Sequence, residues 1–195
     1  MPIDIVGEYV YNSNNDTPEQ LYFRLELNVL LCEELNIAIN SFPMKYHPIT
    51  DENFFTNRDF IGKHWTKKFI RAIQAILNAT KGSVGRGKSF FYHAFGRDVD
   101  EYKLLLHLPE AMIIYRVFFE NNGLMEQWKR AFDSLSQAEK DICLPIIQAN
   151  SFRQLDSSKL SANIRHLLRF YLISRDDVAE ALKEKKTTVV IPEML

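Results

Sequence analysis

A strand, a long helix and a second strand follow one another near the start of the chain, and this order constrains the fold more than any other feature. The segment GEYVYN at 7–12 is rich in Tyr and Val and predicts a strand. IAINSF at 37–42 predicts a second strand that ends before Pro43. A strand, a crossover helix and a strand of this size form a βαβ unit, so the two strands are expected to be parallel.

The helix between the strands has clear start signals. Thr17 is a good N-cap, Pro18 is at the first helical position and Gln20 completes a capping box. The helix is expected to reach about Leu35, with much of its circumference buried, because apolar residues recur at helical spacing and more lie beside them. The spaced residues are Leu21, Leu25, Val29, Cys32 and Leu35.

After this unit the sequence predicts an irregular connection over 43–64 and then helices only. Ser136 and Glu139 predict a capping box, and Pro145 is expected to kink or shorten the helix that contains it. The last segment, 187–195, is expected to be a tail or an edge strand. The expected helices span 65–80, 88–96, 98–108, 109–123, 124–135, 137–150, 158–174 and 175–186.

The expected fold class is therefore α+β and predominantly α-helical, with a βαβ unit at 1–50 and a helical domain at 51–195. Two parallel strands rarely form a stable sheet alone, since parallel sheets normally have several strands and helices on both faces. We expect the chain to associate with a partner, and the sequence leaves open a homo-oligomer or a separate polypeptide.

The charge distribution is uneven although the formal net charge is only −1. The segment 61–97 contains eight basic residues and no carboxylate, which leaves −9 on the rest of the chain. This imbalance indicates either an anionic partner such as nucleic acid, or a solvated helix face that pairs with acidic segments of the same chain. The candidate anion-binding residues are Lys63, Lys67, Lys68, Arg71, Arg86 and Lys88.

The segment KGSVGRGKS at 81–89 matches the phosphate-loop pattern G-x-x-x-x-G-K-[ST]. A phosphate loop needs a buried strand before it and a helix after it. Here an amphipathic helix is predicted to end near Thr80, so the match is interpreted as accidental. The segment is instead expected to be a cationic, glycine-rich connection between two helices.

Other catalytic and metal-binding patterns are missing from the sequence. Cys32 and Cys143 lie far apart and fit no zinc spacing or disulfide framework, which favours a reducing cytoplasm. The five histidines are scattered, with none at the i, i+4 spacing of a helical metal site. No segment is typical of a signal peptide or a membrane span.

The stretch EYVYNSNNDTPEQLYFRLELNVLLCEELNIAINSFPMKYHPI resembles the closing part of the barrel of radical S-adenosylmethionine proteins. The following IGKHWTKKFIRAIQAILNATKGSVGRGKSFFYHAFG is similar to the helical extension after the barrel in a poorly characterised group of them, some of which have a cobalamin-binding domain. The likeness covers about residues 7–120, and its phrases DTPE, SFPMKY and GKHW include no catalytic residue of the family.

The resemblance implies a [4Fe–4S] cluster held by a C-x-x-x-C-x-x-C motif and S-adenosylmethionine as its cofactor. Two distant cysteines cannot supply that motif, so this chain alone is expected to bind no cluster and to catalyse no radical reaction. A barrel-completing polypeptide would supply the earlier strands. The strand ends, which would face the barrel mouth and the adenosine part of the cofactor, are Tyr11, Asn12, Phe42 and Met44.

Two functions therefore remain open. The first is the C-terminal part of a radical S-adenosylmethionine-type iron–sulfur protein, a component of an enzyme and not an autonomous one. The second is a stand-alone helical module that binds nucleic acid or another polyanion through 61–97.

Overall fold

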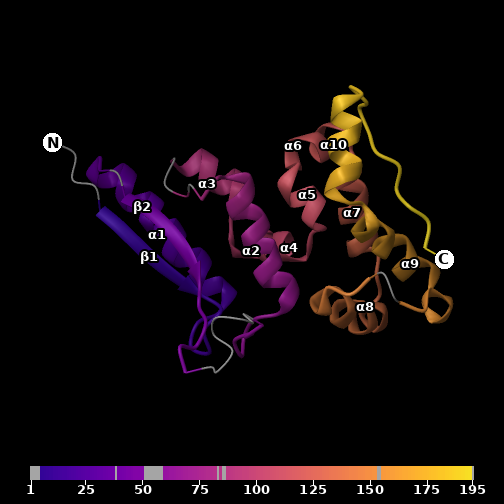
Figure 1. Ribbon diagram of the computed structural model, residues 1–195, viewed down its shortest axis with the longest axis horizontal. Helices are drawn as coiled ribbons and strands as arrows, with labels where there is room; N and C mark the ends of the chain where they lie inside the picture. The colour runs from indigo at the N-terminus through magenta and orange to yellow at the C-terminus, as the bar shows by residue number, and fades with distance from the viewer. Residues whose placement is uncertain are drawn as a thin grey trace. The chain divides into compact units, whose positions relative to one another are not determined.

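The computed structural model describes residues 5–37, 39–50, 59–82, 84, 87–152 and 155–194 (Figure 1). It has an α+β fold that is predominantly helical, with a two-stranded parallel sheet near the N-terminus. The chain divides into two compact units, Met1–His107 and Leu108–Leu195. None of the described helices is long and apolar enough to cross a membrane.

The first unit begins with the predicted βαβ order. Strand β1 (Ile5–Tyr11), helix α1 (Pro18–Leu35) and strand β2 (Ile39–Lys45) follow one another, and the strands pair in parallel. The register runs from the pair Ile5 and Ile39 to the pair Tyr11 and Lys45. Both strands therefore end at the same edge of the sheet.

The prediction that the second strand ends before Pro43 was wrong, because β2 continues to Lys45. The backbone N–H of Tyr46 donates to the carbonyl of Tyr11 at 2.7 Å. Since alternate residues of a parallel strand bond to the same neighbour, the nitrogen of Pro43 faces away from β1. An edge strand tolerates a proline at such a position because no ladder hydrogen bond is lost.

Helix α1 begins and ends as its sequence predicts. Thr17 and Gln20 form the capping box, and Asn36 ends the helix in the left-handed conformation at φ 50°. The expectation that much of its circumference is buried was wrong. Phe23 and Leu27 are 52% and 56% exposed on the side of the helix away from its buried residues. Those buried residues include Leu21, Leu25 and Val29.

The described part of the first unit also contains the helices α2 (Lys67–Ala79), α3 (Lys88–Phe95) and α4 (Val99–His107). Helix α1 packs against α3 and α4, and α2 packs against α4. The ring of Tyr22 on α1 lies 5.5 Å from that of Phe91 and 5.2 Å from that of Tyr102. These contacts join the βαβ segment to the helices, and the compact unit that contains both parts ends after His107.

The second unit is helical in all its described regular elements. The predicted helix 109–123 is divided at Tyr115, and the helix that contains Pro145 continues past it to Ala149. The elements are α5 (Glu110–Ile114), α6 (Arg116–Asn121), α7 (Leu124–Asp133), α8 (Gln137–Ala149), η1 (Ser157–Lys159), α9 (Ala162–Arg169), η2 (Phe170–Leu172) and α10 (Arg175–Lys183).

The described part of the C-terminal segment, 187–194, is a tail without strand pairing. Arg169 of α9 holds it, because its guanidinium donates to the carbonyls of Pro192 at 2.8 Å and Ile191 at 3.2 Å. The same group pairs with the carboxylate of Glu193 at 2.7 Å. The tail is thus attached by side-chain hydrogen bonds and not by a sheet.

Candidate functional site at the carboxyl ends of the strands

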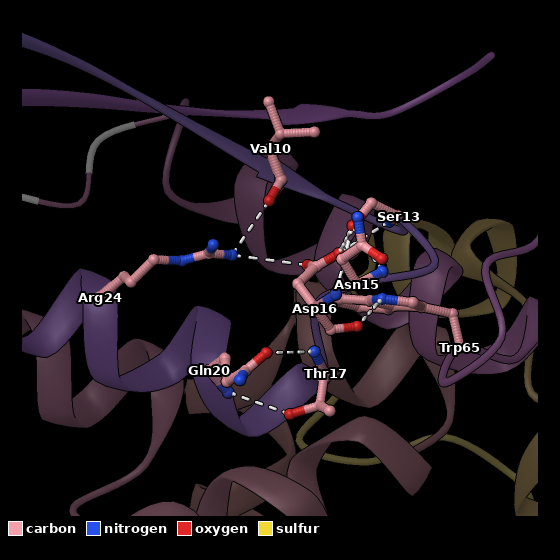
Figure 2. Close-up of polar contacts among 8 residues, drawn as sticks. All are labelled: Val10, Ser13, Asn15, Asp16, Thr17, Gln20, Arg24 and Trp65. Carbon is pink, nitrogen blue, oxygen red and sulfur yellow. Dashed lines mark hydrogen bonds and ion pairs between the residues drawn. The ribbon is translucent and has the colours of Figure 1, made fainter.

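The loop between β1 and α1 is ordered by Asp16 (Figure 2). Its carboxylate accepts hydrogen bonds from the backbone N–H of Ser13, at 2.8 Å, and from the Ser13 hydroxyl. The Arg24 guanidinium pairs with the same carboxylate at 3.4 Å and donates to the carbonyl of Val10 at 3.0 Å (Figure 2). Asp16 therefore ties the loop to the helix, and Arg24 ties the helix back to the end of β1.

Trp65 closes this loop from the next part of the chain. Its indole N–H donates to the backbone carbonyl of Asp16 at 3.0 Å (Figure 2), and its ring lies 5.6 Å from that of Tyr11. Tyr11 is only 2% exposed, and burial raises the pKa of its phenol to about 12 although a hydrogen bond with Gln74 acts in the opposite direction. Tyr11 is a core residue, so its side chain is too buried in this structure to contact a cofactor at the barrel mouth.

Asn12 has the most constrained side chain at the strand ends. It is fully buried, with φ 74°, and its amide donates to the carbonyls of Tyr46 at 3.2 Å and Phe60 at 2.9 Å. Its side-chain oxygen accepts from the N–H of Gly62 at 2.9 Å. These three bonds hold both ends of the long connection after β2. The predicted hydrogen bond from Asn12 to a ribose or carboxylate is therefore replaced by a structural role.

Gly62 is required by the same close approach of two backbone segments. A Cβ atom at this position would lie 2.3 Å from the carbonyl oxygen of Ser13, which is too close for any side chain. The neighbouring backbone N–H of Lys63 donates to the Asn14 side chain at 2.9 Å. The sequence contains a signal for this contact, since Gly62 and Trp65 belong to the phrase GKHW, but no local pattern shows which loop they touch.

The remaining predicted residues at the strand ends are Met44 and Phe42. Met44 is 48% exposed, one residue before the end of β2, so its thioether side chain is open to a ligand. Phe42 is in β2, but its side chain lies outside what the structure describes. Of the four predicted cofactor contacts, Met44 is accessible, whereas Tyr11 and Asn12 are buried and make contacts within the fold.

The described cations of the basic segment differ in how far they reach solvent. Lys63 and Lys67 are exposed, whereas Lys68 is only 1% exposed and so does not offer its ammonium group to a large polyanion. Arg71 is partly buried on α2. Arg86 lies outside the described residues.

The segment that matches the phosphate loop follows α2 and not a strand, as predicted. At its end, Glu33 of α1 accepts the backbone N–H of Lys88 at 3.0 Å and pairs with the Lys88 ammonium at 3.0 Å. Each partner favours the charged form of the other, so the pKa of Glu33 is lowered and that of Lys88 is raised. A carboxylate of the same chain thus occupies the position in which this lysine would meet an anion.

A concave feature among the described residues lies near the sheet. A pocket of about 260 Å³ lies between Pro43 of β2 and the end of α2, where Leu77, Asn78, Lys81 and Gly82 line it. Within the described residues, no group of three His, Cys, Asp or Glu side chains is placed to hold a metal ion.

Comparisons with family models, with curated proteins and with solved structures found no match to this chain.

Proposed function

We propose that this chain is a C-terminal component of a radical S-adenosylmethionine-type protein, and that a second polypeptide carries the earlier strands of the barrel. The observation that carries the proposal is the sheet: within the described residues, β1 pairs only with β2. A parallel pair leaves two open edges, and parallel sheets normally have more strands with helices on both faces. A two-stranded parallel sheet with unpaired edges is the arrangement that we expect at the end of a barrel whose strands are divided between two polypeptides.

The chain's own side chains do not fit the iron–sulfur cluster of such proteins. Cys32 is partly buried on α1, and Cys143 is buried in α8 of the other unit. Burial raises the pKa of the Cys143 thiol to about 11, which disfavours the thiolate that ligates iron. Cluster ligands would therefore have to come from the second polypeptide, and this chain would contribute strand ends, Met44 and the helices α2 to α4.

The test is purification of the tagged chain from its native cells under anaerobic conditions, followed by iron analysis and titration with S-adenosylmethionine. We expect the chain to co-purify with a polypeptide that contains C-x-x-x-C-x-x-C, and the complex to bind iron, sulfide and S-adenosylmethionine. A partner without that motif, or recovery of the chain alone, contradicts the proposal. So does a cluster bound by this chain without a partner.

A matched pair of variants tests the role given to Met44. Met44→Lys, at an exposed position near the end of β2, should weaken S-adenosylmethionine binding of the complex by about tenfold or more because it replaces an apolar contact by a charge. Met125→Lys on α7 is the control, since Met125 is partly exposed in the other unit. Equal affinities for both variants would remove Met44 from the cofactor site.

The polyanion-binding alternative is less well supported. Among the described residues of the predicted set, Lys68 is buried and Lys88 is paired with Glu33, whereas Lys63 and Lys67 are exposed. Because Lys68 and Lys88 are withdrawn from the predicted set, any binding should release fewer counterions, and so have a shallower salt dependence, than six exposed cations would give. Steep, salt-sensitive RNA or DNA binding at micromolar protein that is lost in the double variant Lys63→Gln/Lys67→Gln would favour this alternative instead.

A further inference from the structure

The tail at 187–194 is held on its own unit by few contacts. It runs back from the end of α10 toward α9 (Figure 1), and Val189 is only 8% exposed whereas Val190 is 87% exposed. None of the backbone–backbone hydrogen bonds found among the described residues joins the tail to the rest of the chain. A buried valine and the hydrogen bonds of Arg169 are thus the main described contacts that hold the tail in place.

Arg169 binds three consecutive residues of the tail. Its Nε donates to the carbonyl of Pro192 at 2.8 Å, and its Nη2 donates to the carbonyl of Ile191 at 3.2 Å and to the carboxylate of Glu193 at 2.7 Å. A guanidinium suits this arrangement because its donors form a rigid fork and its charge strengthens each bond. The proline favours an extended backbone at its own and the preceding position, so less conformational entropy is lost when the segment is bound.

The tail is also placed to leave this site without unfolding the unit. The chain turns back after α10 at Lys185, whose φ of 55° costs free energy for a residue with a side chain. The Glu193 side chain is 78% exposed, so its ion pair with Arg169 is weakened by solvent. Segments with few buried contacts and no backbone pairing open locally before a packed core does.

We propose that Arg169 is the centre of a peptide-binding site that the tail occupies in cis. When the tail is released, an extended segment of a partner protein with the same pattern, aliphatic–x–x–Pro–acidic, takes its place. Binding of an extended segment through its main-chain groups, with selected side chains giving specificity, is a recurrent mode of peptide recognition. The tail is then an autoinhibitory segment, because a tethered competitor has a high effective concentration at the site.

A second copy of this chain is a less suitable source of the segment. Each copy could donate its tail only by vacating its own site, so the exchange would form and break the same contacts and would still cost translational and rotational freedom. A different protein gives up no such contacts when it binds. This inference concerns the second unit and does not depend on the proposed radical-protein function.

The first experiment measures binding in trans by the fluorescence anisotropy of a labelled synthetic peptide, TTVVIPEML, which is the sequence of 187–195. The full chain with Val189→Asp and Glu193→Gln has a tail that competes poorly, so it should bind the peptide about tenfold or more tightly than the wild type does. A peptide with Glu193→Lys should bind this variant about tenfold or more weakly than the unchanged peptide. Equal binding of the peptide by both chains, or no binding by either, overturns the inference.

A second experiment measures release of the tail in a chain with a milder substitution, Val189→Cys in a Cys32→Ser background. A soluble thiol reagent should modify the thiol at position 189 faster than it modifies Cys143, which is fully buried in α8. Adding Arg169→Gln should raise the rate at position 189 by about tenfold or more, whereas the control Arg175→Gln, at a half-exposed arginine of the same unit, should change it by less than about twofold. A thiol at position 189 that reacts no faster than Cys143 shows that the tail does not open separately and contradicts the inference.

Light scattering after size-exclusion chromatography identifies the source of the segment. The wild-type chain and the Val189→Asp/Glu193→Gln variant should have the same mass at micromolar concentrations. A wild-type dimer that the double variant dissociates to the 22.8 kDa of one chain would show that the tail of a second copy occupies the site. The assignment of the site to a partner protein would then be wrong.

Discussion

At the scale of single residues, buried polar side chains determine how the loops of the first unit are held. Asn12 uses three hydrogen bonds to connect the end of β1 with both ends of the connection after β2. Its φ of 74° is unusual for a residue with a side chain, although Asn tolerates it better than most. The three hydrogen bonds of the side chain therefore offset the conformational free energy that the backbone of Asn12 costs.

Replacing Asn12 by Gly should lower the free energy of unfolding by about 2–4 kcal/mol, because two carbonyls and one N–H lose their buried partner while the backbone conformation is retained. Urea denaturation measures the change. Asn14→Ala is the control, since Asn14 is exposed and accepts one bond from Lys63, and it should cost less than about 1 kcal/mol. Similar decreases in the free energy of unfolding for both variants would show that the three Asn12 hydrogen bonds stabilise the fold no more than the single Asn14 bond.

Two neighbouring tyrosines allow a second residue-scale prediction. Both are buried, but the hydroxyl of Tyr22 donates to the carbonyl of Gly96 at 3.1 Å, whereas the hydroxyl of Tyr102 has no partner among the described residues. Tyr102→Phe should therefore leave the stability unchanged or raise it by up to about 1 kcal/mol, and Tyr22→Phe should lower it by about 1 kcal/mol. The thermal midpoints of the two variants give the comparison, and the reverse order of stability is the contrary result.

At the scale of secondary-structure elements, the local sequence predicts where a helix begins and ends, but it does not predict which face of the helix is buried. The capping boxes of Thr17 with Gln20 and of Ser136 with Glu139 are both present where the sequence predicts them. A cap depends on residues within one turn, so its signal is local. The exposure of Phe23 depends on which elements lie beside α1, and that information is not contained in the helix itself.

The contact between α2 and α4 should make the first unit sensitive to acid. Burial lowers the pKa of His107 on α4 below 6.5, and the charge of Lys68 on α2 acts in the same direction although a bond with the Lys103 carbonyl opposes it. His107 therefore binds a proton more tightly in the unfolded chain than in the folded one. The stabilisation that comes from neutral His107 is fully present above pH 6.5 and is lost as the pH falls.

Urea titrations at pH 7.5 and pH 5.5 should show this loss in the wild type and a smaller one in His107→Gln. His166→Gln, at an exposed position on α9, should retain the wild-type dependence. An identical loss in the His107 variant would assign the acid sensitivity to other groups.

At the scale of the whole molecule, the chain consists of two compact units that meet in sequence between His107 and Leu108. Each has buried aromatic residues of its own, such as Phe91 in the first and Trp128 in the second. Units with separate cores can unfold separately, and hydrogen exchange resolves such behaviour.

Trp128→Ala removes a fully buried side chain from the second unit and should cost it about 3–5 kcal/mol. Amide exchange should accelerate in α7 and α9, which pack together, whereas exchange in α1 should remain within a factor of about three of the wild type. Phe91→Ala is the converse variant, with acceleration confined to the first unit. Equal acceleration in both units for either variant would mean that the chain unfolds as one cooperative body.

The sequence by itself determined the parallel βαβ unit, the capped helix ends and the failure of the phosphate-loop pattern, because each depends on neighbouring residues. It did not determine the division of the predicted helix 109–123 at Tyr115. Only the tertiary structure decided the roles of particular side chains. Burial turned Tyr11 and Asn12 from candidate ligand contacts into supports of the fold, and Glu33 was brought to Lys88 from another helix. These outcomes follow from contacts between segments that are distant in sequence, and residue spacing alone cannot specify them.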